Sequence, residues 1–198
     1  MLTFLSLLVL AYLLGSICTA IVVCKLLGFP DPRAEGSSNP GTTNVLRIAG
    51  KGPALLTLAG DVLKCVIPVL IGHYFELSYL QLGFIGLSAF MGHLFPIFFN
   101  FQGGKGVATA FGFAIAIHWQ LGAAVIVTWV VIAAITRYSS LAALITWVLA
   151  PFYAWYLVSP DLVYSLAPMS VLLVYRHKEN IIKLKEGRES KIGAKKAE

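Results

Sequence analysis

Residues 36–47 combine small, hydroxyl and amide side chains with one arginine, in a chain that is otherwise mostly apolar. Glycine and proline bend the backbone so that several N–H groups can converge on one anion. Arg47 adds a fixed charge and a planar fork that matches a phosphate. The segment is therefore a candidate anion cradle, although a polar turn between two helices has a similar composition. Its candidate ligand-binding residues are Gly36, Ser37, Ser38, Asn39, Gly41, Thr42, Thr43, Asn44 and Arg47.

A second polar segment, residues 100–109, places Lys105 among Gly103, Gly104 and Gly106. Glycines let the backbone approach a ligand closely, and the free N–H groups of a following helix would face the same place. The segment is not a Walker A loop, because a glycine rather than Ser or Thr follows the lysine. A simple topological turn is the alternative interpretation.

The third polar segment, residues 176–181, follows the last apolar run. If it continues as a helix, His177 and Asn180 share one face and both can contact one ligand. A basic cluster that only meets lipid headgroups is the alternative. In a smaller polar corner at residues 138–140 we expect one of the serines to be a helix N-cap, and Ser140 is also a supporting candidate for the site.

Two charged residues, Asp61 and Lys64, lie inside an apolar run. Their i,i+3 spacing lets them pair on one helix face, and an unpaired charge at that depth is costly. We therefore expect them to pair or to face a polar cavity. His93 is interpreted as an interior histidine with a hydrogen-bond partner, since no carboxylate or cysteine stands at metal-ligand spacing from it. No metal site is predicted.

The composition predicts which elements position these segments. Hydrophobic residues make up 58% of the 198 residues, charged residues only 12%, and the mean hydropathy is +0.82. A soluble domain has about 25% charged residues, so the chain is an integral membrane protein. The apolar runs predict one all-α bundle of about seven transmembrane helices, or five if the short runs are re-entrant. They cover residues 2–24, 53–72, 79–99, 106–117, 120–135, 140–158 and 162–175.

Lysine and arginine predict the orientation of this bundle. Seven spans place Lys25, Arg33, Arg47, Lys51, Lys105, Arg137 and the basic tail on one side of the membrane. By the positive-inside rule that side is cytoplasmic, with the N-terminus external and the C-terminus inside. The net charge of +6 then needs no nucleic-acid partner. Residues 1–198 are expected to form a single domain whose last part, residues 187–198, is a flexible basic tail.

The pattern of motifs resembles the bacterial acylphosphate:glycerol-3-phosphate acyltransferases, the PlsY family, over nearly the whole chain. The matching segments are residues 11–17, 36–47, 61–64, 92–96, 103–109, 138–141 and 176–181. Two positions differ from the loop usual in that family, because Ser38 replaces a glycine and Thr42 replaces an alanine. A serine at position 38 disfavours a left-handed backbone there.

The resemblance implies that an acyl group passes from acyl phosphate to the sn-1 hydroxyl of glycerol 3-phosphate in a bacterial inner membrane, with the active site on the cytoplasmic side. It implies no cofactor, and neither acyl-CoA nor acyl carrier protein as direct donor. Protein partners remain unspecified. The loop at residues 36–44 would hold one phosphate. The catalytic candidates are Ser37, Arg47, Lys105, His177 and Asn180. Glycerol 3-phosphate would contact Arg47, Lys105, His177 and Asn180, supported by Asp61, Lys64, Gly103, Gly104, Gly106 and Ser140.

The sequence shows no Ser-His-Asp pattern, so we expect a mechanism without an enzyme nucleophile. An acyl phosphate has a good leaving group, and its own phosphate could accept the hydroxyl proton. His177 as general base is the alternative. A small phosphate or lipid transporter and a structural subunit are the other classes of protein considered. A transporter should carry polar residues near the midplane of several spans, and a structural subunit does not explain three polar segments on one side.

Overall fold

The computed structural model describes residues 1–193, and all regular secondary structure among them is helical. The longer helices are α1 (Leu2–Gly15), α4 (Lys51–Tyr74), α5 (Tyr79–Leu94), α6 (Val107–Ile117), α7 (Trp119–Thr136), α8 (Ser139–Leu157) and α9 (Val163–Arg176). Three short helices, α2 (Thr19–Leu26), α3 (Thr42–Ala49) and α10 (Lys178–Lys185), and two 3-10 turns, η1 (Ile97–Phe99) and η2 (Pro160–Leu162), complete this part of the chain.

Each of the seven predicted apolar runs is helical, but their lengths differ. Four helical stretches in the described residues, α4, α5 with η1, α7 and α8, are long and apolar enough to cross a bilayer. The pair α1 and α2 could form a fifth span with a bend of 44°. Helices α6 and α9 have only 11 and 14 residues, fewer than the roughly 20 of a straight crossing.

The bend between α1 and α2 is tied to the buried charges of α4. The Lys64 ammonium donates to the carbonyl oxygen of Ile17 at 3.2 Å, inside the bend. It also pairs with Asp61 at 2.9 Å and contacts His93 Nδ1 at 2.6 Å. The predicted Asp61–Lys64 pair and the partnered interior histidine are thus confirmed. A carbonyl released by a broken membrane helix needs a donor, and the ammonium supplies one.

Small residues let the helices approach one another closely. A Cβ on Gly15 would overlap the carbonyl of Ala89, which places α1 directly on α5. A Cβ on Gly112 would overlap the carbonyl of Val62, where α6 packs on α4. Such contacts are typical of membrane bundles, in which packing rather than water exclusion holds helices together.

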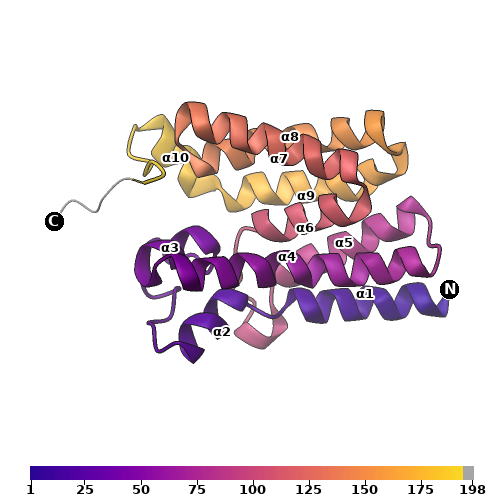
Figure 1. The fold of residues 1–198 in the computed structure, drawn as a ribbon, viewed down its shortest axis with the longest axis horizontal. Coiled ribbons are helices and arrows are strands. Elements are labelled where there is room, and N and C mark those ends of the chain that lie inside the picture. Colours follow the sequence, from indigo (N-terminus) through magenta and orange to yellow (C-terminus); the bar gives the residue numbers. More distant parts are fainter. Residues whose placement is uncertain (194–198) are drawn as a thin grey trace.

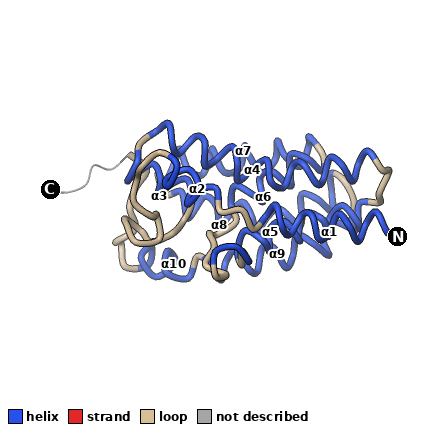
Figure 2. The backbone as a smooth tube through the Cα atoms, turned by 90° about the horizontal axis from the view of Figure 1, so that it is seen from below, coloured by secondary structure: helices blue, strands red, loops and turns tan. Residues whose placement is uncertain are grey.

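The long helices run along one axis, and the polar segments gather at one end of the bundle. Figure 1 shows α2, α3 and α10 at the end opposite the N-terminus, and the view from below in Figure 2 agrees. At this end the expected tail contacts the bundle, where Ile192 N donates to the carbonyl of Arg137 at 2.7 Å. Residues 194–198 of that tail lie outside the described residues.

Candidate active site

The first polar segment is a loop followed by a helix rather than a continuous loop. It is irregular to Gly41, and α3 then begins at Thr42, so Thr42, Thr43, Asn44 and Arg47 are helical. Helix formation follows from the sequence after Gly41, in which Val45 and Asn44 are buried while Thr43 and Arg47 are exposed. The N–H groups of Asn44 and Val45 donate to the carbonyl of Gly41, whereas those of Thr42 and Thr43 have no backbone acceptor among the described residues and are suited to an anion.

Asn44 shapes the loop from inside. Its Oδ1 accepts from the backbone N–H of Ser37 at 2.8 Å, and its Nδ2 donates to the carbonyls of Pro32 and Glu35 at 2.8 and 2.9 Å. Both amide hydrogens are therefore used within the protein. Asn44 was predicted as a phosphate donor, whereas in the structure it holds the loop in its shape.

Ser38 has a left-handed backbone, with φ 55°, contrary to the expectation for a non-glycine residue. Its N–H donates to the carbonyl of Glu35 at 3.1 Å, so the turn itself imposes this conformation. Gly36 is also left-handed, at φ 64°, and a Cβ there would overlap the side chain of Asn44. Gly41, by contrast, has an extended backbone at φ −144°. Asn39 lies between them, half-buried.

At the start of α3, the buried Thr42 hydroxyl has no hydrogen-bond partner in the described part of the chain. A buried polar atom of this kind normally has one, which makes Thr42 a candidate ligand contact. Arg47 lies five residues further along α3, exposed, and makes no ion pair with the described residues. The Arg47 guanidinium is therefore exposed at the surface of α3.

The glycines of the second segment are required by packing against α5. A Cβ on Gly103 would overlap the carbonyl of His93, and one on Gly104 would overlap the His93 ring. Gly106 caps α6 with a left-handed backbone at φ 84°. These glycines, predicted to admit a ligand, first of all let the loop lie against the histidine that contacts Lys64.

Arg176 joins the second segment to the third, a role that the sequence did not predict. Its guanidinium donates to the carbonyls of Gly103 at 2.6 Å and Gly104 at 3.0 Å. It also lies over the ring of Phe95, 5.9 Å from the centroid. The only feature of the sequence that pointed to a role for Arg176 was its position in the basic cluster after the last apolar run.

Lys105 and Asn180, predicted to share one ligand, are in direct contact, because the lysine ammonium donates to Asn180 Oδ1. Asn180 Nδ2 donates in turn to Glu189 at 2.9 Å, and the Ser140 hydroxyl donates to the same carboxylate oxygen at 2.8 Å. The expected N-cap is not formed by a serine, since α8 is capped at Tyr138 and Ser140 bonds to Glu189 instead. Burial lowers the pKa of Lys105, and Glu189 opposes that shift.

His177 lies at the junction of α9 and α10 and is buried. Its Nδ1 is 2.8 Å from the carbonyl of Leu173, which can only accept, so this nitrogen carries the proton. Burial lowers the pKa of His177 to about 4, with Lys105 acting in the same direction. The imidazole is therefore neutral at physiological pH and its Nε2 is a hydrogen-bond acceptor.

A polar pocket of about 320 Å³ lies where the three segments meet. It is lined by Ser38 and Pro40 of the first segment, Phe101, Gln102 and Gly103 of the second, Arg176 of the third, and Arg33. Arg33 is fixed by Asp31, with Nη2 to Oδ2 at 2.7 Å, and this hydrogen bond lowers the pKa of Asp31. Two guanidinium groups and no carboxylate line the pocket, which suits an anion.

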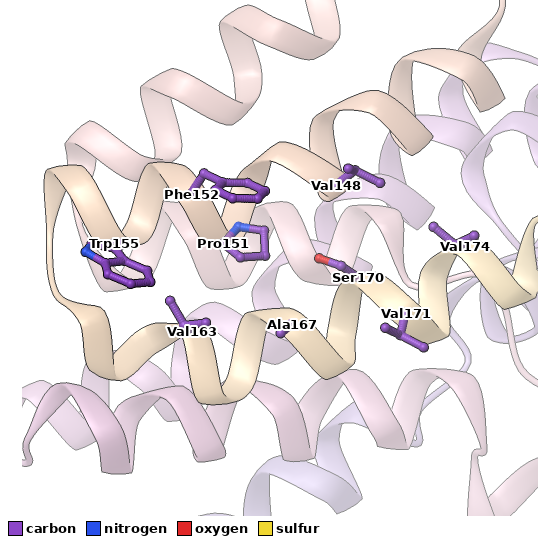
Figure 3. Close-up of a pocket in the computed structure, with 9 residues that line it drawn as sticks. All are labelled: Val148, Pro151, Phe152, Trp155, Val163, Ala167, Ser170, Val171 and Val174. Carbon is purple, nitrogen blue, oxygen red and sulfur yellow. The ribbon is translucent and has the colours of Figure 1, made fainter.

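A second pocket, of about 500 Å³, is apolar and lies along the seam between α8 and α9. Figure 3 shows Trp155 and Val163 at one end of this seam and Val148 and Val174 at the other. Val174 precedes Arg176 by two residues, so the seam approaches the polar end of the bundle. Its lining carries no charged side chain and suits an aliphatic chain rather than a phosphate.

Comparison with known proteins identifies the family to which this fold and sequence belong. The model of the family described as glycerol-3-phosphate acyltransferase matches residues 5–187. The chain is a member of this family. The glycerol-3-phosphate acyltransferases of Methylococcus capsulatus and Actinobacillus succinogenes are 52% and 51% identical to it over 187 residues, 94% of this chain and 94% and 93% of theirs.

Two solved structures of PlsY, an integral membrane glycerol 3-phosphate acyltransferase, have the same fold as this chain. The glycerol 3-phosphate form superimposes with a TM-score of 0.91 at 39% identity and covers 96% of both chains. The lysophosphatidic acid form gives 0.88 at 38% identity, covering 96% of this chain and 95% of that one. The protein is therefore a PlsY-type acyltransferase of phospholipid synthesis and an integral membrane enzyme.

Proposed function

We propose that this enzyme transfers a fatty acyl group from acyl phosphate to the sn-1 hydroxyl of glycerol 3-phosphate. The products are lysophosphatidic acid and inorganic phosphate. The observation that carries the proposal is the convergence of three polar segments, far apart in sequence, on one pocket with two guanidinium groups. The solved relatives support the proposed acceptor and the proposed product, since one PlsY structure is a glycerol 3-phosphate form and the other a lysophosphatidic acid form.

Each substrate has its own part of the site in this proposal. The phosphate of the donor lies near Ser37, Ser38, Gly41 and Thr42, where Ser38 lines the pocket and α3 begins with free N–H groups. Glycerol 3-phosphate lies at Lys105, His177 and Asn180, and Arg47, also proposed to bind it, is exposed on α3. The donor site is supported by the unpartnered hydroxyl of Thr42, and the acceptor site by the Lys105–Asn180 contact.

The reaction requires one bond to form and one to break. The sn-1 oxygen attacks the acyl carbonyl carbon, the bond between that carbon and the phosphate oxygen breaks, and the phosphate leaves with the bonding electrons. The hydroxyl proton passes to the departing phosphate. The enzyme positions the two substrates and balances the charge on the carbonyl and phosphate oxygens with cations and N–H donors.

His177 is better suited to accepting a hydrogen bond from the substrate hydroxyl than to removing its proton. With its pKa lowered to about 4, the imidazole is a weaker base than a phosphate, whose second pKa is about 6. Nδ1 is already bound to the carbonyl of Leu173, so Nε2 alone remains to orient the hydroxyl. The general-base alternative for His177 is thereby disfavoured.

We also propose that the polar end of the bundle faces the cytoplasm. The basic residues at that end, including Lys105, Arg137 and Arg176, follow the positive-inside rule. Seven crossings, counting the short helices α6 and α9, would place the N-terminus outside and α10 inside. Acyl phosphate and glycerol 3-phosphate would then reach the pocket from the cytoplasmic side.

A donor comparison tests the proposed function. Purified enzyme receives glycerol 3-phosphate with palmitoyl phosphate, palmitoyl-CoA or palmitoyl-acyl carrier protein, and lysophosphatidic acid is quantified by mass spectrometry. We expect product with palmitoyl phosphate alone, with one inorganic phosphate released per lipid formed. Equal or faster turnover with palmitoyl-CoA would refute the proposed donor.

A further inference from the structure

After α10 the chain turns back and crosses to the turn between α7 and α8. Ile192 N donates to the Arg137 carbonyl at 2.7 Å, and the Arg137 guanidinium donates to the Ile192 carbonyl at 3.1 Å. Lys191 lies over the ring of Tyr138, 5.7 Å from its centroid. Residues 188–192, called the C-terminal strap here, are thus attached to the bundle at the polar end.

The strap brings one carboxylate to the candidate acceptor site. One oxygen of Glu189 accepts from Asn180 Nδ2 at 2.9 Å and from the Ser140 hydroxyl at 2.8 Å. Asn180 Oδ1 accepts from Lys105. Four side chains, from the strap, α10, α8 and the loop before α6, therefore form one continuous hydrogen-bonded chain.

We propose that Glu189 is a positioning residue that sets the orientation of the Asn180 amide and, through it, the place of the Lys105 ammonium. This inference rests on the proposed function, in which Asn180 and Lys105 bind glycerol 3-phosphate. The chemistry of the groups determines the orientation. A carboxylate only accepts and an ammonium only donates, so the amide must turn its NH₂ to Glu189 and its oxygen to Lys105.

Loss of Glu189 removes one of the two partners that fix this orientation. The amide is then held by the Lys105 ammonium alone, so the place of both groups is less fixed. With Glu189 present, Lys105 keeps an acceptor on the protein side, and its other hydrogens and the second amide hydrogen of Asn180 remain for the substrate phosphate. The strap also lies beyond the part of the chain that the family model matches, which ends at residue 187.

The test separates the hydrogen bonds of Glu189 from its charge. Glu189→Ala removes both, whereas Glu189→Gln keeps an oxygen that can accept from Asn180 and Ser140. Glu186→Ala is the matched control, since Glu186 directly follows α10, three residues before Glu189, and pairs only with the exposed Arg188 in the described residues. KM for glycerol 3-phosphate, KM for palmitoyl phosphate, kcat and the thermal unfolding midpoint are measured for all four proteins.

We expect Glu189→Ala to raise KM for glycerol 3-phosphate about fivefold, the effect of losing one hydrogen bond's contribution, and to leave KM for palmitoyl phosphate unchanged. Glu189→Gln should stay within about twofold of wild type, and so should Glu186→Ala. Wild-type kinetics in Glu189→Ala, an equal defect in Glu189→Gln, or a parallel rise of both KM values would overturn the inference. A wild-type enzyme without turnover of these substrates would instead refute the proposed function.

Discussion

Lys105 combines partial burial, a positive charge and a hydrogen bond to Asn180. If its ammonium binds the phosphate of the acceptor, Lys105→Ala should raise KM for glycerol 3-phosphate at least about tenfold. That factor corresponds to roughly 1.4 kcal/mol of charge-assisted binding. Steady-state kinetics with each substrate varied in turn measures it. Lys51→Ala, which removes an exposed lysine at the start of α4, should match wild type. A defect confined to KM for acyl phosphate would reverse the roles of the two substrate sites.

His177 predicts how stability depends on pH. Its pKa is about 4 in the folded chain and about 6.5 when exposed, because burial disfavours the charged ring. Between these values the unfolded chain binds more protons, so stability present above pH 6.5 is lost as the pH falls toward 4. His177→Gln should therefore lose less stability than wild type over that interval, measured as the thermal unfolding midpoint in one detergent. Parallel curves for the two proteins would show that His177 is not the group responsible.

Individual residues were predictable from the sequence where their chemistry is local. The pairing of Asp61 with Lys64 followed from i,i+3 spacing in an apolar run. The roles of Asn44 and Arg176 did not, because each depends on carbonyl groups that the fold brings to it. The carbonyls bound by Arg176 lie more than 70 residues away in sequence. Glu189 was likewise placed in a flexible tail, although its carboxylate accepts from Asn180.

The loop before α3 is the element whose shape depends most on one small residue. Gly36 has a left-handed backbone, and a Cβ would overlap the Asn44 side chain that bonds the loop together. Gly36→Ala should therefore lower kcat at least about tenfold, since strain and displacement of Asn44 together cost on the order of 1–3 kcal/mol. Gly52→Ala is the control, because a Cβ at Gly52 meets nothing within 4 Å. Wild-type kcat in Gly36→Ala would show that the loop does not position the donor.

The break between α1 and α2 shows what periodicity cannot reveal about an element. Residues 2–24 form one uninterrupted apolar run, which predicts one helix. The structure bends it by 44° at Ile17, whose carbonyl accepts from Lys64. The donor comes from another helix, 47 residues away, and the local signal for a break is limited to Gly15-Ser16, a pair at which helices can kink. The start of α3 was predicted as part of a loop because the local signal there is misleading. Its glycine and threonines are ordinary turn residues.

At the scale of the whole molecule, the orientation in the membrane is open to a direct labelling experiment. Glu76→Cys lies in the turn between α4 and α5, and Lys185→Cys is exposed in α10. A membrane-impermeant maleimide added to intact cells should label the first and not the second, while both should react after the cells are opened. The native Cys18, Cys24 and Cys65 are buried and should remain unlabelled. Labelling of Lys185→Cys in intact cells would contradict a cytoplasmic active site.

The sequence predicted an integral membrane protein, its helical segments and the gathering of polar residues at one end. These features follow from the composition and from the distribution of charged residues between the two ends of the apolar runs. It did not predict the pocket between Arg33 and Arg176, since neither arginine has a distinctive local motif. The contacts between segments arise from tertiary packing, above all the close approach of Gly103 and Gly104 to His93.

One double-label measurement tests direct acyl transfer at this site. Purified enzyme receives palmitoyl phosphate labelled with ³²P and glycerol 3-phosphate labelled with ¹⁴C, and lipid, inorganic phosphate and protein are separated after less than one turnover. The proposed function predicts ¹⁴C in lysophosphatidic acid, an equal amount of ³²P as inorganic phosphate, and no acyl group on the protein by intact mass. An acylated protein that glycerol 3-phosphate then discharges, or release of ³²P without formation of ¹⁴C lipid, would contradict it.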